Sequence, residues 1–281
     1  MKNLIKNNKL IIGMVHFPPL PGSPEFNDDK NLSNILDSVT SDIDSLQSNG
    51  IDSIMFGNEG DRPYLLKASP ESLSTMAYII GLVKNKIKVP FGVNYLWDPI
   101  ATVALGSICN ASFVREVFTG VYDSDMGLWN PDAAQAIRLR KNLNRSDLKV
   151  LFNVNAEFAS PLGNRSTAEK AESAVFSSLA DGICVSGVIT GKSVNSQDLK
   201  ETKDKLIDTP VFANTGVNID NVEEMLSICD GCVIGSSLKY DGITWNNIDP
   251  KRVKKFMDKV NNIRKKIMTC VIGIDIGTTS T

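Results

Sequence analysis

The sequence predicts a single-domain α/β protein with the (β/α)8 TIM-barrel fold over residues 1–267. Eight short apolar segments alternate with amphipathic segments, and this alternation is typical of a parallel sheet covered by helices. The chain has 281 residues, and one closed barrel uses roughly 250, so no second domain is needed. No glycine-rich dinucleotide-binding fingerprint follows the first apolar segment, which disfavours the alternative, an open doubly wound sheet.

The first predicted strand, residues 9–15, ends just before His16, the single histidine of the chain. Four prolines among residues 17–24 predict a stiff loop after it, because proline fixes φ and cannot continue a strand ladder. The first helix is expected at residues 34–48, where apolar residues recur at helical spacing until Asn49-Gly50 ends the pattern.

The remaining units repeat this order of strand and helix. Short apolar runs predict strands at residues 53–56, 91–95, 112–114, 149–154, 182–185, 210–213 and 232–234. Helices are expected at residues 70–84, up to 109, at 131–143, 167–179, 196–206, 222–228 and 250–267. The last helix would cover the final strand, and the residues between the fourth strand and its helix are expected to form a long loop.

The stretch Val211–Lys239 predicts an anion site. Its two strands each end in a turn of small residues, with Asn214, Thr215 and Gly216 in the first turn and Gly235 and Ser236 in the second. Such turns present backbone N–H groups at helix N-termini, and barrels frequently hold a phosphate after strands seven and eight. Asn218 or Asp220 is the expected cap of the intervening helix. The alternative is a pair of ordinary turns without a ligand.

Composition argues against several classes of protein. The net charge of −2 gives no basic surface for nucleic acid, and no apolar run has the length of a membrane span. The N-terminal segment lacks the apolar core and cleavage site of a signal peptide, so we expect a cytoplasmic protein. The five cysteines have no disulfide-framework spacing and are expected to be reduced and mostly buried, including Cys229 and Cys232.

Polar residues at the carboxyl ends of barrel strands converge on one pocket, and they supply the candidate site. The candidate catalytic residues are His16, Glu59, Asp61, Arg115, Glu116 and Asp125. The candidate substrate-binding residues are Asn94, Asp98, Asn153, Ser186, Lys192, Asn214, Thr215, Gly216, Gly235 and Ser236. Asn58, Arg62, Asp123 and Glu157 lie at similar positions.

These residue types indicate proton transfer on an anionic substrate. The Arg115 guanidinium would hold a phosphate or carboxylate through two hydrogen bonds, or pair with Glu116. His16, Glu59 or Asp61 would move a proton; the structural alternatives are a loop anchor and a solvated carboxylate pair. Carboxylates beside amide oxygens would suit Mg²⁺ or Mn²⁺, whereas a single histidine argues against a zinc hydrolase. No residue is assigned as a metal ligand, and the sequence indicates no cofactor other than these two ions.

Several segments together resemble the BtpA/SgcQ family over residues 9–262. They are the proline-rich opening 12–24, residues 57–63, 92–94, 113–122, 124–129, 162–165 and 185–187, and the block 214–239. The resemblance implies a barrel of the ribulose-phosphate-binding type and hence a phosphorylated ligand, but no particular reaction. It is closer to the SgcQ branch of carbohydrate operons than to the photosystem I branch. The latter has an aspartate and histidines where this chain has Asn153, Asn155 and Phe158, so a function using those histidines is not implied.

Residues 268–281 lie outside the predicted barrel. This tail resembles the start of an FGGY sugar kinase, in which Asp275 and Gly277-Thr278-Thr279 would begin a phosphate-binding hairpin. A single strand cannot bind ATP, so we interpret the tail as a fused or overlapping downstream reading frame. The alternative is a strand that pairs with the edge of a neighbouring chain.

Three functions are compatible with these observations. The first is a sugar-metabolism enzyme that binds a phosphorylated sugar or related derivative and acts as an isomerase, epimerase or aldolase. The second is a nucleosidase or glycoside-cleaving enzyme with paired carboxylates such as Glu59 and Asp125. The third is a non-catalytic assembly or regulatory barrel, which a pocket plugged by Trp97, Trp129 or Phe158 would favour. The expected partners are a small anionic substrate and other copies of the chain in a homo-oligomer.

Overall fold

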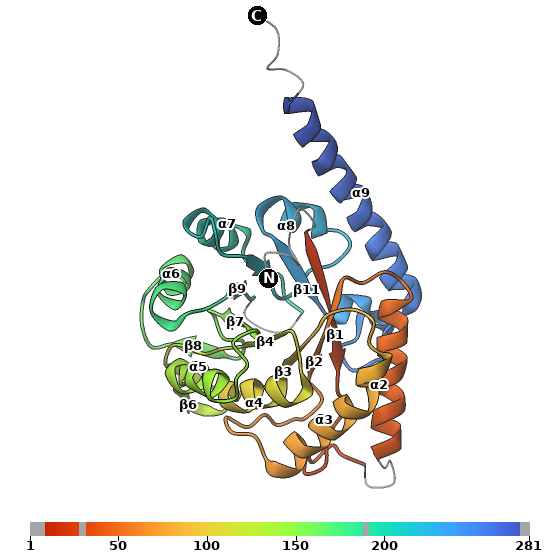
Figure 1. Ribbon diagram of the computed structural model, residues 1–281, viewed down its shortest axis with the longest axis vertical. Coiled ribbons are helices and arrows are strands. Elements are labelled where there is room, and N and C mark those ends of the chain that lie inside the picture. Colours follow the sequence, from red (N-terminus) through yellow and green to blue (C-terminus); the bar gives the residue numbers. More distant parts are fainter. Residues whose placement is uncertain (1–8, 28–31, 188–190, 276–281) are drawn as a thin grey trace, which may run out of the picture.

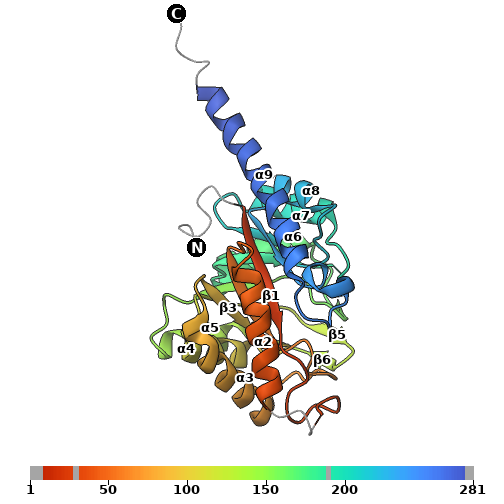
Figure 2. The same cartoon turned by 90° about the vertical axis from the view of Figure 1, so that its right-hand side faces the viewer.

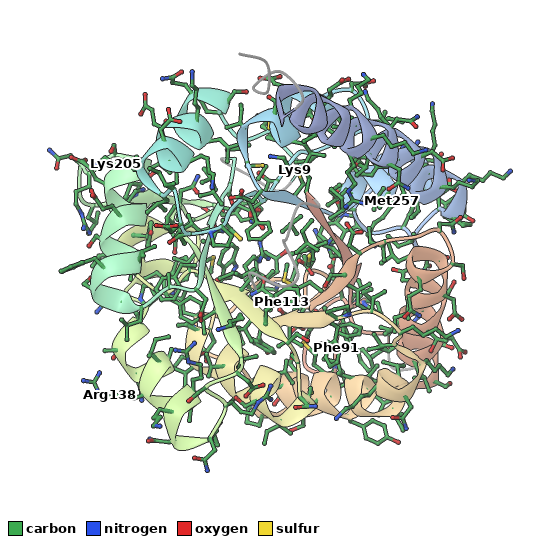
Figure 3. All side chains as sticks on the ribbon, turned by 45° about the horizontal axis from the view of Figure 1, so that its top comes forward. Lys9, Phe91, Phe113, Arg138, Lys205 and Met257 are labelled. Atoms are coloured by element: carbon green, nitrogen blue, oxygen red, sulfur yellow. The ribbon has the colours of Figure 1, made fainter. Side chains whose placement is uncertain are left out.

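The computed structural model describes residues 9–27, 32–187 and 191–275. Its central element is a closed barrel of parallel strands in the order β1-β11-β10-β9-β7-β4-β3-β2. Helices surround the strands as a ring (Figures 1 and 3). The predicted TIM-barrel class is therefore confirmed.

Every predicted barrel strand and helix is present. The barrel strands are β1 (Leu10–His16), β2 (Ser53–Gly57), β3 (Phe91–Asn94), β4 (Phe113–Glu116), β7 (Lys149–Asn153), β9 (Gly182–Val185), β10 (Val211–Ala213) and β11 (Gly231–Ile234). The helices are α2 (Leu32–Gln47), α3 (Pro70–Val83), α4 (Pro99–Cys109), α5 (Ala133–Asn142), α6 (Thr167–Ser178), α7 (Ser196–Lys205), α8 (Val222–Ile228) and α9 (Pro250–Asp275). Short 3-10 helices occupy η1 (Lys84–Lys86), η2 (Ser236–Leu238) and η3 (Tyr240–Gly242).

Side chains fill the barrel interior. Leu10, Ile12, Met14, Met55, Phe113, Leu151, Cys184, Phe212 and Val233 form one buried cluster. Phe113 is labelled within the ring of helices in Figure 3. Successive strand residues point to opposite sides, so His16 shares the interior side of β1 with Met14, two residues earlier. With the interior filled in this way, open space lies at the ends of the strands.

A small antiparallel sheet combines part of the long loop predicted after the fourth barrel strand with residues that follow the fifth. Its strands are β5 (Tyr122–Ser124), β6 (Gly127–Trp129) and β8 (Ala159–Pro161), in the order β6-β5-β8. Three-residue strands are too short to show an alternating pattern, and β8 lies more than thirty residues along the chain from β5, with Asp123 opposite Ser160. The expectation of a loop was therefore wrong for β5 and β6, which pair with each other as a short hairpin.

The helix α9 continues to Asp275, so the described part of the tail is helical rather than a strand. Its carboxyl part projects beyond the barrel in both ribbon views (Figures 1 and 2). A closed barrel offers no free edge for a further strand, whereas a helix satisfies its backbone within itself. Gly277-Thr278-Thr279 of the kinase-like motif lie outside the described residues. None of the described helices has the length and apolar character needed to cross a membrane.

Candidate active site

A cavity of about 870 Å³ opens where the barrel strands end. Its wall has three parts, which we name the acid–base group, the anion turns and the aromatic wall. The acid–base group comprises His16 and Glu59; the anion turns are residues 214–218 and 235–238; and the aromatic wall comprises Tyr64, Trp97 and Phe158. Arg115, Glu157, Lys192, Arg252 and Lys255 also line the cavity.

The acid–base group joins two neighbouring strands. His16 is the last residue of β1, and Glu59 follows the end of β2. The His16 Nε2 atom lies 3.6 Å from Glu59 Oε1, and His16 Nδ1 lies 3.5 Å from the carbonyl oxygen of Thr244. A carbonyl only accepts hydrogen bonds, so this contact favours the tautomer with the proton on Nδ1. The lone pair on Nε2 then faces Glu59.

Burial sets the protonation of this group. Burial, assisted by the charges of Lys239 and Arg115, holds the pKa of His16 well below its ordinary value, so the imidazole is neutral near pH 7. Burial also raises the pKa of Glu59 from 4.5 to about 7, against the opposing effect of the same two cations. Near neutral pH, Glu59 therefore populates both the acid and the carboxylate, which suits a group that takes up and returns a proton.

Arg115 lies at the mouth of the barrel interior. The sequence pattern predicts it just after the strand, but β4 extends to Glu116, and Arg115 shares the interior side with Phe113. Its Nη1 donates to Asn214 Oδ1 at 2.9 Å, and its Nη2 donates to Asn94 Oδ1. These two acceptors are neutral amides, so they orient the guanidinium without neutralising its charge.

Glu116 was predicted to be a catalytic residue, but it is not on the cavity wall. It follows Arg115 on β4, so strand alternation turns it to the other side of the barrel. Its Oε1 accepts a hydrogen bond from the Val117 N–H at 2.7 Å, and its Oε2 accepts one from Asn94 Nδ2. Burial raises the pKa of Glu116 to about 8. It thus orients Asn94, which in turn orients Arg115.

The first anion turn follows β10. Gly216 has a φ of +64°, and a Cβ at this position would lie 2.1 Å from the backbone nitrogen of Ser193. The Gly216 carbonyl accepts hydrogen bonds from Ser193 Oγ at 3.1 Å and Asn221 Nδ2 at 3.0 Å. Thr215 Oγ1 donates to the carbonyl of Lys192 at 2.9 Å. These contacts fix the peptide planes of the turn against the preceding loop.

The second anion turn follows β11 and faces the acid–base group. A Cβ on Gly235 would lie 3.1 Å from His16 Nε2, so the turn and the imidazole approach each other closely. Ser237 Oγ donates to the carbonyl of Val217 at 2.8 Å and thereby joins the two turns. The two anion turns and His16 therefore share one rim of the barrel.

Three cationic side chains line the cavity close to these turns. Lys192 lies in the loop before α7, and Arg252 and Lys255 come from the start of α9. Arg252 Nη1 donates to the carbonyl of Ser237 at 3.4 Å, which places it beside the second turn. Positive charge at this end of the cavity would attract an anionic group on a ligand.

Lys239 is a further cation, buried beneath the site. Its side chain is 2% exposed, as is that of Asp42 on α2, and its Nζ lies 3.6 Å from Asp42 Oδ2. The Lys239 Nζ also donates to the carbonyl of Asn246 at 2.9 Å. Its charge acts on both members of the acid–base group, lowering the pKa of His16 and opposing the rise in the pKa of Glu59.

The aromatic wall bounds another part of the cavity. The Trp97 ring meets the rings of Tyr64 and Phe158 edge-on, with centroid distances of 6.0 and 6.3 Å. It also packs edge-on against Trp129 at 5.2 Å. Tyr64 and Phe158 are half-buried, and Trp97 is almost fully buried. These rings lie on the wall, and among the described residues they do not plug the cavity.

Three of the predicted binding residues lie under the cavity and not on its wall. Ser186 Oγ lies 3.0 Å from Asn153 Oδ1 and accepts a hydrogen bond from Asn214 Nδ2 at 2.7 Å. Asn94, the third, holds Arg115 as described above. Of the remaining predicted binding residues, Lys192, Asn214, Thr215, Gly216, Gly235 and Ser236 line the cavity.

Two predicted aspartates are bound to helix N-termini instead of lining the cavity. Asp61 accepts a hydrogen bond from Ser72 Oγ at 2.5 Å, at the start of α3. Asp98 caps α4, because its Oδ1 accepts from the N–H groups of Ile100 and Ala101, both at 2.9 Å. Both carboxylates satisfy local donors, and neither is on the cavity wall.

Asp125 is exposed in the turn between β5 and β6, together with Asp123 on β5. The hairpin was missed in the sequence, and it carries both carboxylates away from the cavity. Within residues 9–27, 32–187 and 191–267, no group of three or more His, Cys, Asp or Glu side chains is placed to hold a metal ion. The carboxylates expected to suit Mg²⁺ or Mn²⁺ therefore do not form such a ligand set.

The site contains four residues that were not among the candidates predicted from the sequence: Arg252, Lys255, Lys239 and Tyr64. The two α9 residues had a recognisable signal, since they are basic residues near the N-terminus of the last barrel helix, at the rim where strands end. Lys239 and Tyr64 reach the site through loops, which carry no periodic signal.

Comparison with known proteins finds one matching family model and several similar relatives. A family model named the BtpA family matches residues 7–262. The sgc region protein SgcQ of Escherichia coli is 43% identical over 265 residues, which make up 94% of this chain and 99% of SgcQ. The photosystem I biogenesis protein BtpA of Synechocystis is 33% identical over 251 residues, covering 88% of this chain and 86% of that protein.

Among solved structures, the fold is similar to (S)-3-O-geranylgeranylglyceryl phosphate synthase from Thermoplasma acidophilum, in complex with its substrate sn-glycerol-1-phosphate. The TM-score is 0.58 at 13% identity, and the match covers 93% of this chain and 96% of the synthase. At that identity the likeness concerns the fold alone.

Proposed function

This chain belongs to the BtpA family, and we propose that it is an enzyme of sugar metabolism that acts on a phosphorylated sugar or a related anionic derivative. The anionic group binds at the anion turns. The acid–base group transfers a proton at the neighbouring part of the sugar, as an isomerase, epimerase or aldolase requires.

Two buried polar atoms on the cavity wall carry this proposal. In the part of the chain that the structure describes, Glu59 Oε2 and Arg115 Nε lack a hydrogen-bond partner. Leaving a buried polar group unpaired costs about 1–3 kcal/mol, and folded proteins do so rarely. One of these atoms is an acceptor and the other a donor, and both residues line the same cavity. A polar ligand in the cavity would supply hydrogen-bonding partners to these two residues.

The anion turns and their cations support a phosphorylated ligand. Gly216 and Gly235 bring backbone close to the cavity, while Lys192, Arg252 and Lys255 supply positive charge at the same end. Small-residue turns at this position of a barrel frequently hold a phosphate. The substrate named for the similarly folded Thermoplasma synthase, sn-glycerol-1-phosphate, is also a phosphate ester.

The proposed chemistry starts with the Glu59 carboxylate taking a proton from the carbon next to a sugar carbonyl. The C–H electron pair forms a carbon–carbon double bond, and the carbonyl π electrons move to its oxygen as an enolate. Arg115 stabilises that negative oxygen. Return of the proton from Glu59 to the adjacent carbon, with transfer of a hydroxyl proton to the oxygen, completes an isomerisation. His16 Nε2, unprotonated and facing Glu59, assists by accepting a hydrogen bond from the protonated carboxyl group.

A binding screen with a proton-exchange readout tests this function. Ribose 5-phosphate, ribulose 5-phosphate and glucose 6-phosphate are screened by thermal shift, and ligands that bind are followed by NMR in D₂O. We expect deuterium to enter the carbon next to the carbonyl, and Glu59→Gln to slow that exchange at least 100-fold. The exposed Glu201→Gln on α7 is the matched control. Absence of binding by every sugar phosphate would contradict the proposal.

Arg115→Gln provides a separate test of the charged contact. Glutamine keeps a polar amide near Asn94 and Asn214 but removes the cation. We expect the sugar-phosphate thermal shift to decrease while the circular dichroism spectrum of the barrel is retained. An unchanged shift would rule out a role of Arg115 in binding.

Glycosidic cleavage is a second candidate, because Glu59 and Glu157 line the same cavity and the charge of Glu157 contributes to the raised pKa of Glu59. Glu157 thus takes the place of the exposed Asp125 as the second carboxylate. The protonated carboxyl group of Glu59 would protonate the leaving group, and Glu157 would activate water. Release of a free sugar from a nucleoside or glycoside, detected by chromatography, would favour this reaction.

A further inference from the structure

The aromatic wall points to a second feature of the substrate. On the basis of the proposed function, we infer that the phosphorylated sugar also carries a planar ring, a nucleobase or another aryl group, and that Tyr64, Trp97 and Phe158 bind this ring. The substrate class is then a ring-bearing sugar phosphate, chemically similar to a nucleoside 5′-monophosphate.

A continuous set of contacts places the acid–base group between the anion turns and the aromatic wall. Gly235 approaches His16, whose Nε2 lies 3.6 Å from Glu59 Oε1. The Tyr64 hydroxyl donates to the Glu59 carbonyl at 3.0 Å, and the Tyr64 ring meets that of Trp97 with centroids 6.0 Å apart. A ligand that reaches from the turns to the wall therefore carries its sugar past Glu59.

Trp97 supplies a second observation, which does not depend on the spatial order of the anion turns, the acid–base group and the aromatic wall. Its indole Nε1 is buried and has no hydrogen-bond partner among the described residues, and the side chain lines the cavity. An indole N–H is a donor only, and buried donors are normally paired. A ring nitrogen or carbonyl oxygen of a heterocyclic ligand provides the matching acceptor, which a simple sugar phosphate bound at the other end does not.

Phe158 is held in an unusual backbone conformation. Its φ is +56°, in the left-handed region that residues with side chains rarely adopt. Its ring nevertheless lies on the cavity wall, 6.3 Å from the ring centroids of both Tyr64 and Trp97. Strained residues of this kind are concentrated at ligand-binding sites, which agrees with a role in presenting a ring to the ligand.

The size of the cavity also exceeds the need of a small sugar phosphate. Its volume of about 870 Å³ lies near the upper end of the roughly 300–1,000 Å³ typical of sites for drug-sized ligands. Aromatic side chains bind flat π systems through stacking and edge contacts, and they are the usual platform for bases. The polar and aromatic parts of the cavity thus match the two parts of one ligand.

Calorimetric titration of the full chain tests the ring-binding inference separately from the proposed sugar-phosphate function. The probes are ribose 5-phosphate, the common nucleoside 5′-monophosphates, adenosine and a disaccharide phosphate. We expect at least one nucleoside monophosphate to bind roughly 5- to 150-fold more tightly than ribose 5-phosphate, the range expected for stacking one base on an aromatic side chain. That ligand should also quench the fluorescence of Trp97.

Two variants test whether the aromatic wall causes the tighter binding of the nucleotide. Phe158→Leu keeps an apolar side chain but removes one of the three rings, so it should lower nucleotide affinity towards that of ribose 5-phosphate and leave the latter unchanged. Trp245→Phe is the control, since Trp245 is 52% exposed and stacks on Arg62 outside the cavity wall. Its substitution should change neither affinity.

The outcomes separate failure of this inference from failure of the proposed function. If ribose 5-phosphate binds and no nucleotide binds more tightly, or if the disaccharide phosphate binds as tightly as the best nucleotide, the ring subsite is wrong and the sugar-phosphate function stands. If no phosphorylated probe binds, the proposed function itself is wrong. If adenosine binds as tightly as its monophosphate, the anion turns do not contribute.

Discussion

The raised pKa of Glu59 predicts a measurable dependence of stability on pH. A carboxyl group that is harder to ionise in the folded state opposes folding wherever the unfolded chain has already released its proton. The rise from 4.5 to about 7 corresponds, at about 1.4 kcal/mol per pH unit, to a cost of about 3 kcal/mol above pH 7. At pH 5 the folded state is largely protonated, whereas the unfolded chain is only partly ionised, and the cost falls below about 1 kcal/mol.

Replacing Glu59 by glutamine removes this titration while keeping the shape of the side chain. Relative to the wild type, Glu59→Gln should therefore gain about 2 to 3 kcal/mol more stability at pH 8 than at pH 5. The gain should develop between about pH 4.5 and 7, because the native state holds more protons in that window and stability falls as pH rises. Glu116 titrates in both proteins, so its contribution cancels in the difference.

Urea unfolding followed by circular dichroism measures this quantity. Free energies of unfolding are determined at pH 5 and pH 8 for the wild type, for Glu59→Gln and for the exposed control Glu201→Gln. The control should show no pH-dependent gain. Equal effects of Glu59→Gln at the two pH values would show that Glu59 is ionised normally in the folded barrel, and the assignment of Glu59 as a proton carrier near pH 7 would then fail.

Two further substitutions test the surroundings of the acid–base group. Gly235→Ala places a Cβ about 3 Å from the His16 ring. We therefore expect the imidazole to be displaced and the rate of proton exchange measured by NMR to fall at least tenfold. Gly81→Ala in α3 is the control and should have no such effect, because its added Cβ meets no atom within 4 Å. Asp42→Asn leaves the buried Lys239 without its counter-charge, so we expect the free energy of unfolding in urea to fall by about 3–5 kcal/mol. A decrease below about 1 kcal/mol would mean that the ion pair is not needed to keep the lysine buried.

Local patterns were sufficient to predict the barrel. Each strand is a short apolar run and each helix has a periodic apolar face, so these elements could be located without knowledge of their partners. The helix caps were located less well, because Asn221 is the N-cap of α8 and the predicted caps Asn218 and Asp220 precede it. Asn218 Oδ1 instead accepts from the N–H groups of Asp220 and Asn221, at 2.8 and 3.2 Å, in the turn before the helix. The strands of the β5-β6-β8 sheet have three residues each, and β8 pairs with β5 from beyond β7, so sequence periodicity could not reveal this sheet.

The composition of the site was less predictable, because a position at a strand end does not fix the direction of a side chain. Arg115 and Glu116 are adjacent in sequence, yet one lines the cavity and the other supports it from the opposite side of β4. Asp61 and Glu59 flank one glycine, but a hydroxyl at the start of α3 binds Asp61 and leaves Glu59 in the cavity. Such choices depend on donors that lie elsewhere in the chain.

The same non-local contacts explain how the barrel maintains a buried carboxyl group on the cavity wall. Glu59 is buried at an energetic cost, and the cations that limit this cost, Arg115 and Lys239, are themselves buried. Arg115 is held by neutral amides, so its charge remains available to a ligand, whereas Lys239 is held by Asp42 from α2. If Asp42 paired with Arg115 instead, the positive charge facing the cavity would be neutralised. The arrangement therefore separates the permanent ion pair from the cavity and leaves the charge of Arg115 facing it.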